Sequence, residues 1–320
     1  MSTLFDLKAP GNDTKHKAIL EGTNLKIVDP DLQKKINSVK LSPSMINSIL
    51  SSPGDWVISK YIESDVLLDE LDFLIRGNWF HSIMENFFSK GVSARSVDEL
   101  KKSVRTVSAQ EKYKPLLANP DNKEWLKKAL ANYINTFYNE DSKEKVAEVF
   151  LNGKKQKGVE LFVNGTIGEA KRNCLGFIDR VTEGTNGLKV HDWKTGGRIE
   201  NFNPEKKISD SNSFDYWRQQ TFYALLLQQK GMKIEEAALI FPCAKEPQKI
   251  YIPFDDEKVI EQTIKDTESC DKIFAECIEN DYTFPMAKGK WNKWASYLCG
   301  LGSSPMPKIN EDKLQSIIKI

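Results

Sequence analysis

Apolar residues recur at helical spacing through the first half of the chain. Phe80, Ile83, Met84 and Phe87 repeat at intervals of three and four residues, which gives a helix one apolar side. This spacing predicts a helix over residues 77–89. Capping residues and similar spacing predict further helices over 42–50, 55–61, from 96 onward, over 121–139 and over 142–151.

The pattern changes near Gly158, where short runs of β-branched and aromatic residues replace the helical spacing. These runs predict strands over residues 159–163, 175–181, 188–193, 237–241 and 249–253. The segment 184–187 is a strong signal for a hairpin turn between the second and third of these strands. Helices are predicted over 214–230, stopped by Gly231, and over 255–280.

This order of elements predicts an α/β (α+β) fold in which the α-rich N-terminal half packs on a sheet. Residues 41–285 are expected to form one domain, because no linker is visible within them. Residues 1–40 are polar and weakly patterned, so we expect a mobile arm or a peripheral wrap. Residues 286–320 are expected to be an irregular extension anchored by Trp291, Trp294 and Tyr297.

Composition narrows the classes of function. Of 320 residues, 40% are hydrophobic and 28% charged, as in ordinary globular proteins, and the net charge is +1. A nucleic-acid site would therefore have to be a local basic patch. No apolar run approaches the roughly 20 residues that span a membrane, and the N-terminus lacks the apolar stretch of a secretory signal. The five cysteines are irregularly spaced, which favours the reducing cytosol.

Three charged residues lie on the predicted hairpin. Asp192 and Lys194 are two positions apart on one strand, so they share a face. If the turn centres between Thr185 and Asn186, Asp179 lies opposite Asp192; if it centres one residue later, Asp179 lies opposite Lys194. Either register puts all three side chains on one face, whereas the register between them would separate the set.

Two carboxylates on one face of apolar strands need a compensating charge, because each disfavours ionisation of the other. A divalent cation supplies that charge, and hard oxygen ligands suit Mg²⁺ or Mn²⁺. A D-x-K pattern alone more often marks a solvated strand face. The hairpin, the apolar neighbours and the flanking motifs favour a metal site here.

The strings GFIDRV and VHDWKTG, followed by a Gln and Tyr pair, resemble the PD-(D/E)XK nucleases of the RecB-nuclease branch. The family pattern is a His on an upstream helix, then G-x-x-D, then D/E-x-K, then Q-x-x-x-Y. Residues 41–53 also resemble the family's leading helix, and the resemblance spans roughly residues 41–255. The matching positions, in order, are His81, Gly176 with Asp179, Asp192 with Lys194, and Gln219 with Tyr223.

The resemblance implies a restriction-endonuclease-like core, which is a mixed central sheet flanked by helices. It also implies a phosphodiester hydrolase that uses Mg²⁺ or Mn²⁺ and acts on DNA. Lys194 would serve the attacking water, while Gln219 and Tyr223 would line the DNA channel. The implied metal ligands are His81, Asp179, Asp192 and the backbone carbonyl of Trp193.

Other residues near these motifs have two readings. Glu85, one helical turn after His81, is either a surface residue or a neighbour of the metal. Glu160, on the first strand, is either ordinary strand polarity or part of the site. His191 points to the face opposite Asp192, so a structural role is expected.

One departure from the family concerns iron. Several relatives hold an iron–sulfur cluster through a Cys before the early Pro and three Cys near the C-terminus. Here the early position is Ser52, and Cys270, Cys277 and Cys299 lack the tight spacing of cluster sites. We therefore expect no iron–sulfur cluster.

The leading hypothesis is an exonuclease that acts on DNA ends in recombination, repair or phage DNA processing, with a recombinase or annealing protein as a further partner. The first alternative is an endonuclease of a restriction or defence system with the same core. The second is a catalytically silent DNA-binding scaffold, which the intact Asp179, Asp192 and Lys194 argue against.

Overall fold

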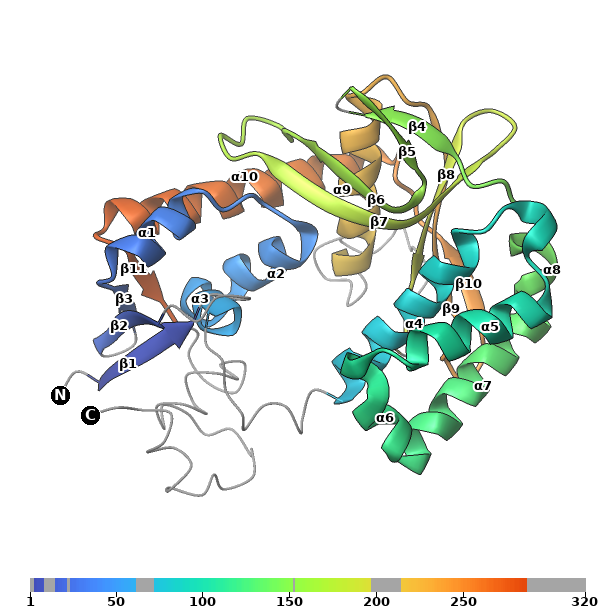
Figure 1. Ribbon diagram of the computed structural model, residues 1–320. Helices are drawn as coiled ribbons and strands as arrows, with labels where there is room; N and C mark the ends of the chain where they lie inside the picture. The colour runs from blue at the N-terminus through green and yellow to red at the C-terminus, as the bar shows by residue number, and fades with distance from the viewer. Residues whose placement is uncertain are drawn as a thin grey trace. The chain divides into compact units, whose positions relative to one another are not determined.

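The computed structural model describes residues 3–8, 15–21, 24–61, 72–151, 153–196 and 214–286. The chain divides into two compact units, each made of segments that are distant in sequence (Figure 1). The first unit comprises residues 1–68, 166–174 and 264–320, and the second comprises residues 69–165 and 175–263. None of the described helices has the length and apolar character needed to cross a membrane.

A mixed sheet forms the centre of the second unit, and its strand order in the described residues is β10-β9-β8-β7-β6. Strand β8 runs parallel to β9, whereas β7 and β10 run antiparallel to β8 and β9 respectively. The strands are β6 (Val159–Gly165), β7 (Cys174–Glu183), β8 (Leu188–Trp193), β9 (Ile234–Phe241) and β10 (Gln248–Tyr251). With the flanking helices, this sheet confirms the predicted fold class.

Helices of the second unit pack through aromatic side chains. In α4 (Asp72–Phe88), Trp79, Phe80 and Phe87 are fully buried in a cluster that includes Trp193 and Ile240 of the sheet. Each buried aromatic side chain contributes about 1.5–3 kcal/mol, so this cluster fixes α4 against the sheet. The neighbouring helices are α5 (Val97–Ser108), α6 (Lys114–Ala118), α7 (Pro120–Thr136), α8 (Tyr138–Asp141) and α9 (Phe214–Gln228), with 3₁₀ turns η3 (Val92–Ala94) and η4 (Glu111–Tyr113).

Predicted helix ends are confirmed at several places. The Ser42 hydroxyl accepts the Met45 backbone N–H, and the Ser96 hydroxyl accepts the Glu99 backbone N–H, as N-caps do. Gly231, with a φ of +77°, lies just after α9 in the left-handed region that glycine adopts without strain. These local signals are readable in sequence because they depend only on neighbouring residues.

The helix predicted over residues 142–151 is wrong. Residues Glu148–Leu151 form strand β4, which pairs with β5 (Lys154–Lys157) as a separate hairpin. Along β4, buried Val149 and Leu151 alternate with exposed neighbours, which is the period of a strand. The long preceding helices made a helical spacing look continuous where a two-residue period had already begun.

Within residues 1–40, for which the sequence analysis expects a mobile arm or a peripheral wrap, the first unit contains three strands in the described residues. Strands β1 (Thr3–Lys8), β2 (Lys15–Glu21), β3 (Asn24–Ile27) and β11 (Thr283–Pro285) form a sheet in that order. Because β3 pairs with β11, more than 250 positions away in the printed numbering, local patterning could not reveal this sheet. The unit also contains α1 (Pro30–Asn37), α2 (Pro43–Ser51), α3 (Pro53–Tyr61) and most of α10 (Glu257–Glu279).

Part of the sequence analysis concerns residues outside those described. The expected irregular extension over residues 286–320 lies outside the described residues except for Met286, and so do Trp291, Trp294, Tyr297 and Cys299. These expectations stay predictions.

Candidate metal and catalytic site

The pairing of β7 with β8 sets the position of the site. Arg180 pairs with His191 and Glu183 with Leu188, which is the register expected for a turn centred between residues 185 and 186. The pairing ends at Arg180 and His191. Beyond this point the Trp193 backbone N–H donates to the Asp179 carboxylate at 2.7 Å instead of to a β7 carbonyl. The acidic side chain therefore lies where the two strands separate.

Asp192, Lys194 and Gln219 form one hydrogen-bonded set. The Lys194 ammonium lies 2.6 Å from Asp192 Oδ2 and donates to Gln219 Oε1 at 2.7 Å. The Gln219 amide nitrogen donates to Asp192 Oδ1 at 3.0 Å and to the Tyr223 hydroxyl at 3.1 Å. Gln219, from α9, therefore holds the predicted catalytic acid and lysine in fixed relative positions.

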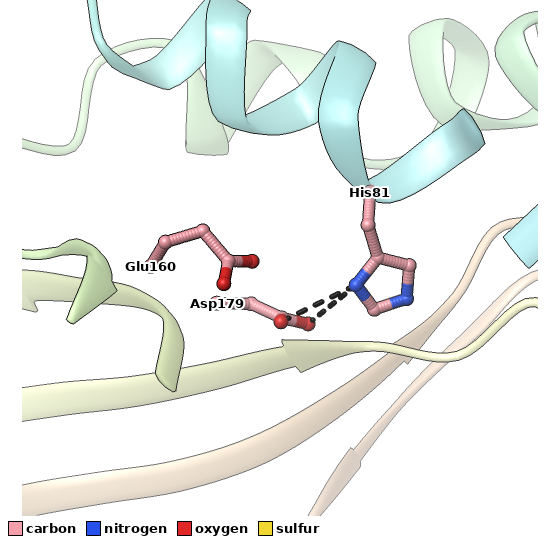
Figure 2. A group of neighbouring side chains, drawn as sticks. All are labelled: His81, Glu160 and Asp179. Atoms are coloured by element: carbon pink, nitrogen blue, oxygen red, sulfur yellow. Dashed lines mark hydrogen bonds and ion pairs between the residues drawn. The ribbon is translucent and has the colours of Figure 1, made fainter. Parts of the chain in front are cut away.

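A second set joins α4, β6 and β7, as Figure 2 shows. The His81 imidazole Nδ1 lies 3.3 Å from both Asp179 carboxylate oxygens. One ligand atom from each of His81, Glu160 and Asp179 lies within 4.8 Å of the other two, so the three could hold one metal ion. The sequence analysis left two readings for Glu160, ordinary strand polarity or a role in the site, and the structure places its carboxylate beside His81 and Asp179.

Glu160 has an unusual backbone. Its φ of +47° lies in the left-handed region, which a glutamate side chain rarely adopts. Just before it, a Cβ at Gly158 would lie 2.4 Å from the Val181 carbonyl oxygen, so only glycine allows this close approach to β7. The conformation costs on the order of 1–3 kcal/mol, and such strain concentrates at functional sites.

The electrostatics of the site show competing charges. Burial disfavours the imidazolium of His81, but the Asp179 carboxylate raises the pKa of His81 to about 9. Burial acts to raise the pKa of Asp179. The positive charge of His81 and the hydrogen bond from the Trp193 N–H outweigh this effect and hold the pKa of Asp179 below its usual value.

The pKa values of Glu160 and Asp192 are raised, in contrast to that of Asp179. Burial raises the pKa of Glu160 to about 7, and the charges of Asp179 and Glu85 add to the rise. Burial also raises the pKa of Asp192, although Lys194 beside it acts in the other direction. Several carboxylates therefore lie close together in a buried region, where their negative charges repel one another. A divalent cation bound between them would offset that repulsion.

The donor set fits a hard divalent cation. Two carboxylates and one imidazole nitrogen converge from three different elements, and carboxylate oxygens are the ligands that suit Mg²⁺ and Mn²⁺. Asp192, predicted as a ligand, has its oxygens at Lys194 and Gln219. Its metal role therefore stays a prediction.

The remaining predicted residues are placed as follows. Glu85 lines the same pocket as His81 and Glu160 but is not one of the three closest donors. The Trp193 side chain is buried in the aromatic core, and the ligand role of its carbonyl stays a prediction. Tyr223 is only 5% exposed, so it supports Gln219 more directly than it could line an open channel.

Behind the site, a buried charged network joins β7 and β8. Arg180 is fully buried, and its guanidinium lies 2.9 Å from Asp141 Oδ1 and 2.7 Å from the His191 Nδ1. The other imidazole nitrogen of His191 lies 2.7 Å from Glu236 Oε1. His191 therefore points away from Asp192 and takes part in this buried network, which agrees with the structural role expected for it.

Sequence reasoning missed several residues around the site. The Lys194 ammonium lies 5.0 Å above the Tyr216 ring centre, and a pocket of about 580 Å³ beside His81 is lined by Asn78, Ser82 and Lys112. Tyr216 could have been found, since it is one helical turn before Gln219. The pocket residues carry no motif, because Asn78 and Ser82 of α4 are joined there by Lys112 of η4, about thirty positions further along the chain.

Comparisons with known proteins agree with this geometry in one respect. The sequence model of the PD-(D/E)XK nuclease superfamily matches residues 40–301. No curated protein matches the chain. A crystal structure described as a "putative exonuclease" from Eubacterium rectale is 13% identical, with 79% of this chain and 86% of that chain covered and a TM-score of 0.45. The crystal structure of a protein named SSO0001 is 13% identical, with 58% and 73% covered and a TM-score of 0.22.

Proposed function

Since the chain belongs to the PD-(D/E)XK nuclease superfamily, we propose that this phosphodiester hydrolase is a Mg²⁺- or Mn²⁺-dependent deoxyribonuclease that removes nucleotides from DNA ends. The observation that carries the proposal is the joining of two sets of side chains through β7 and β8. One set offers metal donors, and the other offers a lysine held beside a carboxylate. The proposed settings are recombination, repair or phage DNA processing, with a recombinase or annealing protein as partner.

Metal binding is proposed for His81, Glu160 and Asp179, with Asp192 as the further ligand that the family pattern implies. A bound divalent cation lowers the pKa of a coordinated water and offsets negative charge on the phosphate. The protein's own contribution is to hold these donors rigidly. Asp179 is fixed by the Trp193 N–H, and His81 is fixed by the aromatic packing of α4.

Lys194 is proposed to orient the attacking water and to offset developing charge. Its ammonium is held by Asp192, by Gln219 and over the Tyr216 ring, so it is positioned before substrate arrives. Preorganised charge of this kind needs no rearrangement during the reaction. Gln219 and Tyr223 are proposed to keep this arrangement at the edge of the DNA-binding surface.

The test is digestion of DNA labelled at its ends. Linear single- and double-stranded substrates and covalently closed circles are incubated with Mg²⁺, with Mn²⁺ or with EDTA. We expect metal-dependent cleavage of the linear substrates, loss of activity in EDTA, and resistance of the closed circles. Asp192→Ala serves as the inactive control.

Each alternative outcome has a distinct meaning. Cleavage of closed circles would replace the exonuclease by an endonuclease with the same site. Undiminished cleavage by the purified Asp192→Ala variant would remove Asp192 from the site. Absence of cleavage under every metal condition would contradict the proposed function.

A further inference from the structure

The pocket beside the metal donors has two chemically different ends. Along α4, Asn78, Ser82 and Glu85 line it at intervals of three and four residues, so they share one side of the helix. Asn78 and Glu85 are seven positions apart, which is about 10 Å along the axis at 1.5 Å per residue. The pocket therefore extends from the metal donors toward the N-terminal end of α4.

The acidic end is the one already described. Glu85, Glu160 and Asp179 all line the pocket there, and this end would repel a phosphate in the absence of a cation. A DNA strand that continues along the pocket must meet positive charge further on, because each nucleotide adds one negative charge.

Lys112 supplies charge at the other end. Its ammonium lies 4.7 Å above the ring centre of Tyr113. The Tyr113 hydroxyl donates to the Asn78 carbonyl at 3.0 Å and lies 2.9 Å from the Ser82 hydroxyl. These contacts place Lys112 beside the stretch of α4 from Asn78 to Ser82, which begins about two helical turns before Glu85 and ends about one turn before it.

The Tyr113 ring beneath the Lys112 ammonium is held in place by its neighbours. Tyr113 is 1% exposed and stacks on Trp79, with ring centres 6.3 Å apart. Because the Tyr113 hydroxyl donates its hydrogen to Asn78, the Ser82 hydroxyl must donate to Tyr113 and cannot donate to a ligand at the same time. Of the residues that line this pocket, His81 and Lys112 carry the basic side chains, and His81 lies beside Asp179.

We propose that the DNA strand on one side of the scissile bond occupies this pocket and that Lys112 binds one of its backbone phosphates. At 3.4 Å per nucleotide, this phosphate lies within about three nucleotides of the scissile bond. Lys112 is thus a substrate-positioning residue and takes no part in the chemical step. The inference rests on the proposed function, since it requires a nucleic-acid strand in the site.

Lys114 provides a matched control. It lies two positions away in the same segment, is exposed, and pairs with Glu111 rather than lining the pocket. Both Lys112→Ala and Lys114→Ala remove one surface lysine and leave the buried Tyr113 in place. Thermal unfolding of both variants checks that each is folded.

Binding is measured by fluorescence anisotropy with labelled DNA, in an Asp192→Ala background that prevents turnover. Lys112→Ala should raise Kd several-fold. The slope of log K against log salt is negative, and it should become less negative by about 0.7 for single strands or about 0.9 for duplex DNA, the value for one phosphate contact. Lys114→Ala should leave the slope unchanged. In the active enzyme, Lys112→Ala should raise KM while kcat changes less than twofold.

A substrate series locates the phosphate. Oligonucleotides carry one neutral methylphosphonate at successive positions on either side of the cleavage site. One position should weaken binding to the Lys112 protein and have no effect on the Lys112→Ala protein.

The failing results differ from those for the function itself. If the wild type cleaves DNA but Lys112→Ala and Lys114→Ala have equal Kd values and salt slopes, this inference is wrong and the nuclease proposal stands. If no methylphosphonate position depends on Lys112, the phosphate contact is likewise refuted. If the wild type cleaves no DNA with any metal, the proposed function has failed first.

Discussion

At the scale of single residues, the site depends on side chains that restrain one another. Lys194 is held by Asp192 and Gln219, and Asp179 is held by His81 and a backbone N–H. Each group therefore has little freedom to adopt another position before substrate binds. Substitutions at these positions should affect rate far more than folding.

Lys194→Ala should reduce the cleavage rate by on the order of 10²-fold or more, in the range for single electrostatic or proton-transfer groups. The affinity for metal should survive, because an ammonium has no lone pair to offer a cation and the proposed donors His81, Glu160 and Asp179 stay in place. Single-turnover kinetics at saturating metal measure the rate. A variant with weak metal affinity but normal turnover at saturating metal would show that the lysine has been assigned the wrong role.

Gly176→Ala should perturb the support of the site. An added Cβ would lie 2.3 Å from a ring carbon of Tyr223, so the tyrosine that binds Gln219 must move. We expect a loss of about 1–3 kcal/mol in the free energy of unfolding, the usual cost of overpacking, together with a lower kcat. Urea unfolding and cleavage assays measure these quantities.

Gly91→Ala is the matched control for this substitution, because no atom other than those of Gly91 and its two chain neighbours lies within 4 Å of an added Cβ there. Equal stability and activity of the two variants would mean that Tyr223 can shift without consequence for the site.

At the scale of elements, the β7–β8 pair has a different role on each face. The face that carries Asp192 holds the proposed chemistry, and the opposite face carries Arg180 and His191, one position from Asp179 and Asp192 respectively. Arg180 also lies over the rings of Phe88 and Trp193. The charged network thus links the sheet to α4 and α8 directly beneath the site.

Arg180→Met should destabilise the protein by about 3–5 kcal/mol, because it leaves the buried Asp141 without its partner. Adding Asp141→Asn should recover part of the loss, since the uncompensated charge is then removed. The free energy of unfolding in urea measures both effects.

Lys101→Met is the control for the loss of one ion pair on the surface, since Lys101 and its partner Asp98 are both exposed. It should change stability very little. An effect as large as that of Arg180→Met would mean that burial of the pair is not the cause.

At the scale of the whole molecule, a divalent cation should link α4, β6 and β7. A ligand that binds only the folded state stabilises it by about 2.7 kcal/mol at a hundred times its Kd. Tm should therefore rise as Mn²⁺ or Mg²⁺ is added to metal-free protein. Glu160→Gln should reduce this rise, because it removes one of the three closest donors. A rise of equal size in wild type and variant would place the cation elsewhere.

Iron should be absent from the purified protein. The residue before Pro53 is Ser52, whose hydroxyl accepts the Asp55 backbone N–H at the start of α3. Cys270 and Cys277 are buried in α10 and lie about 10 Å apart along its axis. Protein purified without oxygen should be colourless near 400 nm, and a brown preparation with about four iron atoms per chain would contradict this expectation.

The local features of this fold can be predicted from the sequence alone. Helix caps such as Ser42 and Ser96, the stop at Gly231, and the hairpin between β7 and β8 depend on residues adjacent in the chain. The two-residue period of a strand then places Asp192 and Lys194 on one face whatever the rest of the fold does. For this reason local sequence is enough to predict that these two side chains lie together at the centre of the site.

The folded structure determines the remaining contacts. It placed Glu160 beside His81 and Asp179, with a left-handed φ that no local pattern signals, and it brought Lys112 to the pocket along α4. It also paired β3 with β11 across almost the whole chain. Each of these contacts joins segments distant in sequence, so its free energy depends on how the whole chain packs and leaves no periodic trace in either segment.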